Sequence, residues 1–422
     1  MNTTNTTVNV LDLVDPNTFA QPGKADAIFL WLRENQPVCR VETDWYRPFW
    51  SVTRYQTIRD IEQNSGQFLS NPRTVLLAKP VERKFEESFG TCNGFESLIN
   101  HDAPRHFKLR QITQSWFAPK NIGTLQSRLE TLSREFVDKM RDLGGECDFA
   151  RDIAKPYPLH VIMSILGVPP EGEPRMLRLT QELFGYQDEE LSRSGRQEKG
   201  DGLAEAMEIM LDFHSYFSAM IEDRRSNPQD DLATVIATAE VDGEPISDLE
   251  KISYYSITAT AGHDTTSYSL AGGLEALMEN PHQLAYLKEN PDKIEDAIEE
   301  IIRWVTPVKH FVRTAKEDCV VEGVTIRAGE SIVLHYPSAN RDAEIFEDPF
   351  KFNVQRFPNN HLAFGYGPHI CLGRHLAKLE LAIFLRELLP RLEHIELNGA
   401  PRTAAGIFVT GLTSLPVRYE IH

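Results

Sequence analysis

The feature that most constrains this chain is a glycine-rich turn around one cysteine, near the C-terminal end of its 422 residues. The turn reads Phe364-Gly365-Tyr366-Gly367-Pro368-His369-Ile370-Cys371-Leu372-Gly373. Two glycines and a proline fold the backbone tightly before Cys371, and Gly373 leaves room after it for a flat group to approach. The segment from about Gly373 to Leu389 is predicted to be a helix, because it has an apolar face made of Leu372, Leu376, Leu379 and Ile383.

Cys371 therefore lies at the N-terminus of a predicted helix. Free backbone N–H groups and the helix dipole are expected to lower the pKa of the thiol there and to favour the thiolate, which suits an iron ligand. The other cysteines are widely spaced and form no CxxC pair, so neither a disulfide framework nor a zinc site is expected. We interpret them as ordinary small apolar residues; they are Cys39, Cys92, Cys147 and Cys319.

A second informative segment is the long helix predicted from Leu249 to Asn280, which would be roughly 48 Å long. Its centre reads Ala261-Gly262-His263-Asp264-Thr265-Thr266. This centre is weak, because glycine costs ~1 kcal/mol and threonine is a poor helix former. Thr265 can donate to the carbonyl of Ala261 and open the helix beside the carboxylate of Asp264, at a place suited to water, oxygen and proton delivery. His263 is expected to face away as a core histidine.

The remaining patterns predict a mainly α protein with a small, segregated β part. Further helices are predicted over 55–61, 125–143 and 203–225, and strands over 50–53 and 330–334. We expect one domain over residues 21–422 and a polar tail over residues 1–20. The polar run from Ser192 to Gly202 is predicted to be mobile, as either a surface loop or a lid over an active site.

Composition excludes several classes of function. The formal net charge of −18 disfavours binding to nucleic acids and to anionic membranes. The N-terminal residues are polar and resemble neither a signal peptide nor a membrane anchor, and no run of roughly 18 apolar residues occurs. The expected location is therefore the cytoplasm.

The cysteine turn resembles the haem-binding motif of cytochromes P450, F-G-x-G-x-H-x-C-x-G-x-x-L-A-x-x-E, and matches it at every fixed position from Phe364 to Glu380. The resemblance extends from about Trp50 to Pro416. Residues 306–315 and 336–342 are similar to the bacterial α-terpineol branch, and steroid-oxidising bacterial members share parts of this pattern. The resemblance implies the triangular, mainly helical P450 fold. It also implies haem b (iron protoporphyrin IX) ligated by Cys371.

The resemblance implies roles for other residues. Asp264 and Thr265 correspond to the acid–alcohol pair that activates dioxygen. The propionates of the haem would be bound by His106, Arg110, Arg313 and His369. A buried structural cluster would consist of Glu300, Arg303 and Arg356.

A substrate pocket is predicted from helical spacing before Asp264 and from segments expected on the distal side. Its residues are Phe95, Leu98, Ile257, Thr260, Ala261, Val308, Phe408 and Val409. The set is mostly apolar, and Thr260 is expected to supply a single hydrogen bond. The prediction is a haem-thiolate monooxygenase that hydroxylates a small hydrophobic substrate, either a terpenoid or an alkyl-substituted aromatic or alicyclic compound. A steroid is the alternative.

The chain lacks room for a fused electron-transfer domain, so a separate ferredoxin and ferredoxin reductase are expected to supply electrons to a monomeric enzyme. A basic patch on the cysteine side could bind the ferredoxin or could be an ordinary solvated surface; it consists of Arg105, Lys108, Lys120, Arg374, His375 and Lys378. Two other classes remain possible. A peroxide-driven haem enzyme would not need the Asp264–Thr265 pair, and a haem-thiolate gas sensor would need an output domain, which the sequence does not show.

Overall fold

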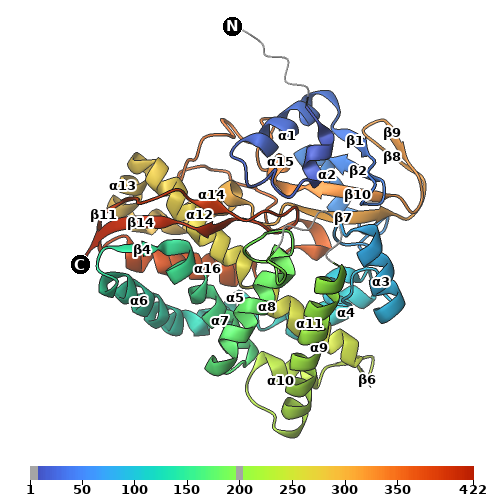
Figure 1. The fold of residues 1–422 in the computed structure, drawn as a ribbon, viewed down its shortest axis with the longest axis horizontal. Helices are drawn as coiled ribbons and strands as arrows, with labels where there is room; N and C mark the ends of the chain where they lie inside the picture. Colours follow the sequence, from blue (N-terminus) through green and yellow to red (C-terminus); the bar gives the residue numbers. More distant parts are fainter. Residues whose placement is uncertain (1–7, 196–202) are drawn as a thin grey trace.

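The structure is a computed structural model that describes residues 8–195 and 203–422. Helices form most of the molecule, and the short strands form small separate sheets, one group at the upper right and another at the left of Figure 1. The predicted mainly α class with a segregated β part is confirmed. In the described ranges, the helices of eight or more residues are α1 (Lys24–Asn35), α2 (Tyr55–Gln63), α3 (Lys79–Phe89), α4 (Arg105–Gln114), α6 (Gln126–Asp142), α7 (Pro156–Leu166), α8 (Glu173–Gly185), α9 (Leu203–Ser226), α11 (Asp248–Ala261), α12 (Asp264–Glu279), α13 (Pro281–Glu289), α14 (Ile294–Val305) and α16 (Arg374–Leu388).

The largest sheet is built around β10 (Ser331–His335), whose five residues are all buried. Its strand order is β1-β2-β10-β7-β3, with β10 parallel to β2 and antiparallel to β7. A second sheet has the order β11-β14-β4. The bounds of the other strands are β1 (Val38–Val41), β2 (Phe49–Val52), β3 (Phe68–Leu69), β7 (His310–Ala315), β4 (Glu146–Asp148), β11 (Leu392–Leu397) and β14 (Pro416–Ile421).

The main core lies between the central helices α12, α14 and α16, and the nearby α6 and α7. Glycines let α12 and α14 pack closely. A Cβ atom at Gly273 would lie 2.6 Å from a side-chain carbon of Ile301, and one at Gly272 would lie 2.8 Å from Val305. Because such contacts are too short, these positions fix α12 directly against the apolar face of α14.

The long helix predicted from Leu249 to Asn280 is two helices, α11 and α12, so the prediction of one continuous helix was wrong. Gly262 and His263 separate them. The predicted weak point is at the break, where the Thr265 hydroxyl donates to Ala261 O at 2.8 Å. The His263 ring is buried toward α7 and α8, with Nε2 3.0 Å from Lys155 O and Nδ1 3.0 Å from Thr180 Oγ1. The ring of His263 thus ties the break to α8 and to the residue before α7.

Part of the predicted N-terminal tail is packed against the protein. A short 3-10 helix over Val10–Val14 buries Leu13 in a cluster with Ile28, Phe29 and Leu32 of α1. The expectation of a polar tail is therefore corrected for residues 8–20, because their apolar side chains cover α1. Residues 1–7 lie outside the described residues.

The predicted polar run lies mostly outside the described residues, since 196–202 are not described. Before that gap, Arg193 contacts Glu182 of α8 and pairs with Asp212 of α9 at 2.8 Å. Among the described helices, none combines the length and the apolar composition that a membrane span requires.

A buried ion cluster joins α14 to the irregular stretch before the cysteine turn. Arg303 Nε and Nη2 donate to the two oxygens of Glu300 at 2.7 and 2.8 Å, and Arg356 Nε donates to Glu300 at 3.1 Å. Glu300 and Arg303 are fully buried. Arg303 also donates to the backbone oxygens of Asn340 and Pro349. The cluster therefore holds residues 340–356 against the helical core.

Replacing Glu300 with glutamine should destabilise the fold, because two buried guanidinium groups lose their counter-charge. Breaking such a buried pair costs about 3–5 kcal/mol. The measurement is the urea midpoint of unfolding. Glu295→Gln on the same helix is the matched control, because it removes a solvent-exposed pair with Arg386 and should change stability by at most about 0.5 kcal/mol. Equal midpoints for the two variants would contradict this account.

Candidate functional site

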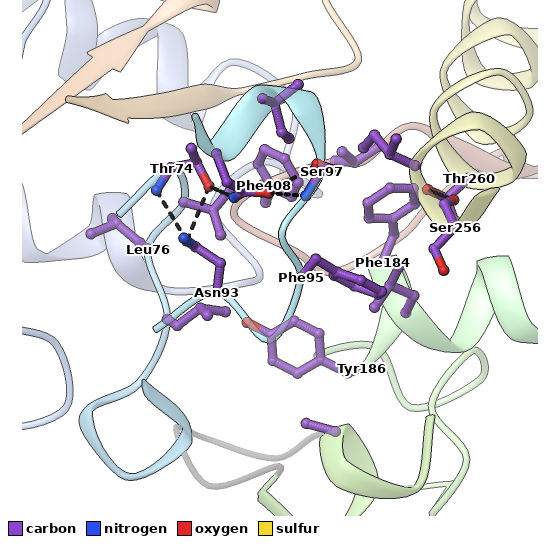
Figure 2. A pocket seen from close by; sticks show the side chains of 18 of the residues that line it. Thr74, Leu76, Asn93, Phe95, Ser97, Phe184, Tyr186, Ser256, Thr260 and Phe408 are labelled. Atoms are coloured by element: carbon purple, nitrogen blue, oxygen red, sulfur yellow. Dashed lines mark hydrogen bonds between the residues drawn. The ribbon is translucent and has the colours of Figure 1, made fainter. Parts of the chain in front are cut away.

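Two adjoining cavities lie at the break between α11 and α12. One, here called the cysteine cavity, extends between this break and the turn at Cys371. The other, here called the apolar cavity, lies under α8, α9 and the segment before α3 (Figure 2). Six residues line both cavities and mark where they meet: Ile99, Ile257, Ala261, Thr265, Val308 and Phe311.

Cys371 lines the cysteine cavity at the start of α16. Its backbone N–H donates to Phe364 O at 2.9 Å, which closes the turn. Burial raises the pKa of the thiol, and the N–H groups of Gly373 and Arg374 together with Arg110 only partly oppose this. The lowered pKa predicted for Cys371 was therefore wrong for the protein alone, because desolvation outweighs the helix N-terminus. A cation bound at Sγ would supply the charge that the thiolate needs.

Basic side chains gather at one edge of the cysteine cavity. Arg110, Arg313 and His369 line it, and the ring of His106 lies 4.0 Å from the ring of His369. Arg313 Nη2 is 3.4 Å from Glu62 Oε1, and within the described chain Glu62 is the single carboxylate in ion-pair contact with these four residues. His106 Nε2 is buried without a hydrogen bond. The four residues predicted from separate segments are thus brought together.

The charges at this edge are unbalanced. Burial lowers the pKa of His106 to about 4, and Arg110 contributes to this shift. Burial, Arg313, His106 and Arg110 likewise hold the pKa of His369 far below its usual value. Burial raises the pKa of Glu62 to about 7, so this carboxyl group is a weak source of negative charge at neutral pH. The edge is therefore suited to bind two further carboxylates, and its donors fit the propionates of a haem whose iron faces Cys371.

Thr265 and Asp264 are neighbours but face different surroundings. Thr265 lies where the two cavities meet. Asp264 is 1% exposed and lines neither cavity; its Oδ1 is 3.2 Å from His263 Nδ1, and its Oδ2 has no hydrogen bond. Burial raises the pKa of Asp264, opposed by His263 and Lys155. The carboxyl group therefore tends to hold a proton just behind Thr265.

The apolar cavity contains seven of the eight residues predicted for a substrate pocket, and its volume is about 190 Å³. Leu98 is the exception. It lines the cysteine cavity, because the short turn at Leu98–Asn100 directs it to the other side. No charged side chain of the described chain lines the apolar cavity. Figure 2 shows Phe95, Phe184 and Phe408 around it, and the last two rings are 5.9 Å apart in an edge-to-face contact.

Polar side chains that line the apolar cavity mostly bond to the protein. The hydroxyl of Thr260 donates to Ser256 O at 2.8 Å, so it is not the free donor that was expected. Among the described lining residues, Tyr186 is the one polar side chain without a hydrogen bond to the protein. Sequence reasoning missed Tyr186 and Phe184, which end α8, and also Leu76 and Met210. Periodicity predicts helices but not which of their faces borders a cavity.

Comparison with known proteins decides the family. The model of the family described as "Cytochrome P450" matches residues 36–419. The chain belongs to the cytochrome P450 family. It is accordingly a monooxygenase that holds haem iron through a cysteine thiolate, and of its five cysteines only Cys371 lines either cavity.

Several bacterial P450s are similar over nearly the whole chain. Cytochrome P450-terp of Pseudomonas sp. is 41% identical over 96% of this chain and 95% of the relative. A steroid C26-monooxygenase of Mycobacterium tuberculosis is 34% identical over 96% of each chain. Among solved structures, CYP108D1 of Novosphingobium aromaticivorans matches with a TM-score of 0.88 and 42% identity over 97% of each chain. CYP268A2 of Mycobacterium marinum, in complex with pseudoionone, matches with a TM-score of 0.88 and 30% identity over 98% of each.

The basic patch predicted on the cysteine side of this P450 is largely paired. Arg105 is 2.5 Å from Glu250, Lys108 is 2.6 Å from Asp242, and Lys378 contacts Glu299. No ion pair within the described chain involves the other three predicted members, Lys120, Arg374 and His375. The patch therefore has fewer basic side chains without an acidic partner than the sequence suggested.

Removing one basic group from the cavity edge should weaken haem retention in this P450. If Arg110 binds a haem propionate as predicted, Arg110→Gln leaves that propionate without its cationic partner, and hydrogen bonds to charged groups contribute about 1.5–3 kcal/mol. Loss of haem to apomyoglobin should therefore be roughly tenfold to hundredfold faster. Lys108→Gln on the same helix is the control, because its partner Asp242 is exposed. Equal rates for both variants would show that Arg110 does not bind the haem.

Proposed function

We propose that this P450 hydroxylates one C–H bond of a compact, neutral, hydrophobic molecule, either a terpenoid or an alkyl-substituted aromatic or alicyclic compound. The observation that carries this is the apolar cavity without charged side chains, which meets the cysteine cavity at Thr265. Apolar ligand surface buried there contributes roughly 25 cal/mol per Å², so binding needs no ionic anchor. The single free hydroxyl of Tyr186 is suited to orient one neutral oxygen of a substrate.

Within this proposal, Cys371 is the iron ligand, and His106, Arg110, Arg313 and His369 bind the haem propionates. The bound haem supplies the redox chemistry by which dioxygen delivers one oxygen atom to substrate and one to water. The protein residues hold the cofactor, exclude water from the apolar cavity and position the substrate at Ala261 and Thr265.

In this proposal, Asp264 and Thr265 deliver protons to the point where the two cavities meet. Asp264 holds its proton in the interior, since burial raises its pKa. Thr265 presents its hydroxyl oxygen where the cavities meet, while its hydrogen is directed to Ala261 O. A proton that leaves Asp264 can reach the meeting point through a water at Thr265, and the carboxylate left behind faces the positive charge of Lys155.

The volume of the apolar cavity favours a compact substrate over a steroid. Pockets that hold drug-sized ligands have volumes of roughly 300–1,000 Å³, and this cavity has about 190 Å³. The relative named P450-terp and the relative bound to pseudoionone are compatible with such a substrate. A steroid is the second candidate, supported by the similarity to steroid C26-monooxygenases.

We further propose that electrons come from a separate ferredoxin and its reductase. Lys120, Arg374 and His375 are the members of the predicted basic patch without an acidic partner in the described chain. Arg374 lies close to the proposed ligand, since its guanidinium donates to Cys371 O at 3.3 Å. A negatively charged partner could bind there against an otherwise acidic protein.

Substitution of the acid–alcohol pair should separate oxidation of NADH from hydroxylation. Thr265→Ala should bind haem and substrate normally but form several-fold less product per NADH, because the proton is misdirected and peroxide or water forms. Asp264→Asn should slow turnover roughly a hundredfold, which is within the usual contribution of a proton-transfer group. Thr131→Ala, on α6, removes a similar side-chain bond within a helix and serves as the control. An unchanged product ratio in Thr265→Ala would remove this residue from the mechanism.

The substrate class is tested by a binding panel. Terpenes and alkylbenzenes should displace water from the ferric iron, seen as a spin-state shift of the haem spectrum, at lower Kd than sterols. Decan-1-ol and decanoate form a matched pair that isolates the effect of charge. The alcohol should bind at least about tenfold more tightly, because an unpaired carboxylate is costly to desolvate. Preference for a sterol or for decanoate would contradict the proposed substrate class.

A further inference from the structure

The histidine at the break between α11 and α12 faces only the protein interior, and its surroundings determine which ring nitrogen carries hydrogen. His263 is fully buried, and its Nε2 is 3.0 Å from Lys155 O. A backbone carbonyl only accepts hydrogen bonds, so Nε2 carries the hydrogen. In the neutral ring Nδ1 is therefore an acceptor.

Two groups lie next to Nδ1. The hydroxyl of Thr180 is 3.0 Å from Nδ1 and 3.0 Å from Leu177 O, and it can donate its one hydrogen to either acceptor. The other group is Asp264 Oδ1, at 3.2 Å. A carboxyl group that keeps its proton can donate it to Nδ1, whereas an ionised carboxylate facing a neutral Nδ1 would place two acceptors together. When Thr180 donates to Leu177 O, one proton shared between Oδ1 and Nδ1 makes their 3.2 Å contact favourable.

A neutral pair is the favoured form at this position. Both residues are at most 1% exposed, and separating two charges in such an interior requires desolvating both. The other charged side chain that acts on the pair is Lys155, which precedes α7, and its positive charge opposes protonation of His263. Asp264 Oδ2 has no hydrogen bond in the described chain. A proton carried on this second oxygen can therefore leave without breaking another hydrogen bond.

Building on the proposed function, we infer that His263 and Asp264 act as one proton-storing pair, in which the proton that Asp264 releases during oxygen activation is shared with His263 Nδ1. In the release step an O–H bond of Asp264 breaks and the proton passes to a water at Thr265. The carboxylate that remains is stabilised by Lys155, and one proton from bulk water restores the pair. His263 is a positioning residue in this reaction, since it touches neither cavity.

Two substitutions distinguish a role of His263 in storing a proton from a purely structural role at the break between α11 and α12. His263→Phe removes both ring nitrogens. His263→Gln keeps an N–H donor for Lys155 O and an acceptor for Asp264, but it cannot bind a proton. Both variants should form about threefold to tenfold less product per NADH, and the pH dependence of this ratio should change in both. His160→Gln, which removes a surface contact with Glu173, is the control. Haem content and substrate Kd should stay unchanged.

An infrared measurement on the ferric enzyme without substrate tests the pair independently of turnover. A carbonyl band of a protonated carboxyl group should be present at neutral pH, be lost in Asp264→Asn, and move to higher frequency in His263→Phe, where it lacks an acceptor. Absence of this band in the wild-type enzyme would overturn the inference. Full recovery of the product ratio in His263→Gln, or no change in either variant, would also overturn it. If no hydrophobic compound were hydroxylated at all, the proposed function would fail, whereas the infrared result would still decide the state of the pair.

Discussion

The arrangement of this protein depends on positive charge held at one edge of the cysteine cavity. Arg110 and Arg313 carry this charge beside His106 and His369, whose ring pKa values are lowered by burial. Glu62 is a poor counter-charge because burial raises its pKa to about 7. Such an edge is unfavourable without anions. In the proposed site the two carboxylates of a haem would balance this charge, and its iron would be held by Cys371, whose thiol pKa burial raises in the protein alone. The negative charge of the haem carboxylates and the positive charge of the arginines would thus neutralise each other.

The break between α11 and α12 lies on the side of the cysteine cavity opposite the turn at Cys371. Gly262 admits Ile162 of α7, since a Cβ at this position would lie 2.7 Å from it. The ring of His263 anchors the break to the segments beside it, because Nε2 donates to Lys155 O and Nδ1 lies next to the hydroxyl of Thr180. This leaves Thr265 at the meeting point of the two cavities and keeps Asp264 behind it. In the proposed mechanism, the same local break therefore opens the site to substrate and keeps Asp264, the proton source, out of contact with it.

Local patterns in the sequence were sufficient for the fold class and for much of the site. The glycine turn identified Cys371, and the glycine and threonine at 262 and 265 identified the weak helix centre. Local patterns could not show how side chains are desolvated, so the direction of the pKa shift of Cys371 was predicted wrongly. They also could not show that Leu98 lines the cysteine cavity or that the hydroxyl of Thr260 is already bonded. Tyr186 was missed because its free hydroxyl is evident only when distant segments are packed together.

The most direct test of this account is the absorption spectrum of the ferrous–carbonyl form, recorded for the wild-type enzyme and for Cys371→Ala at equal haem content. The account predicts the red-shifted band of a thiolate-ligated haem in the wild-type enzyme and its complete loss in the variant. Persistence of that band in Cys371→Ala would show that another group ligates the iron, and would contradict the site derived from the cysteine turn.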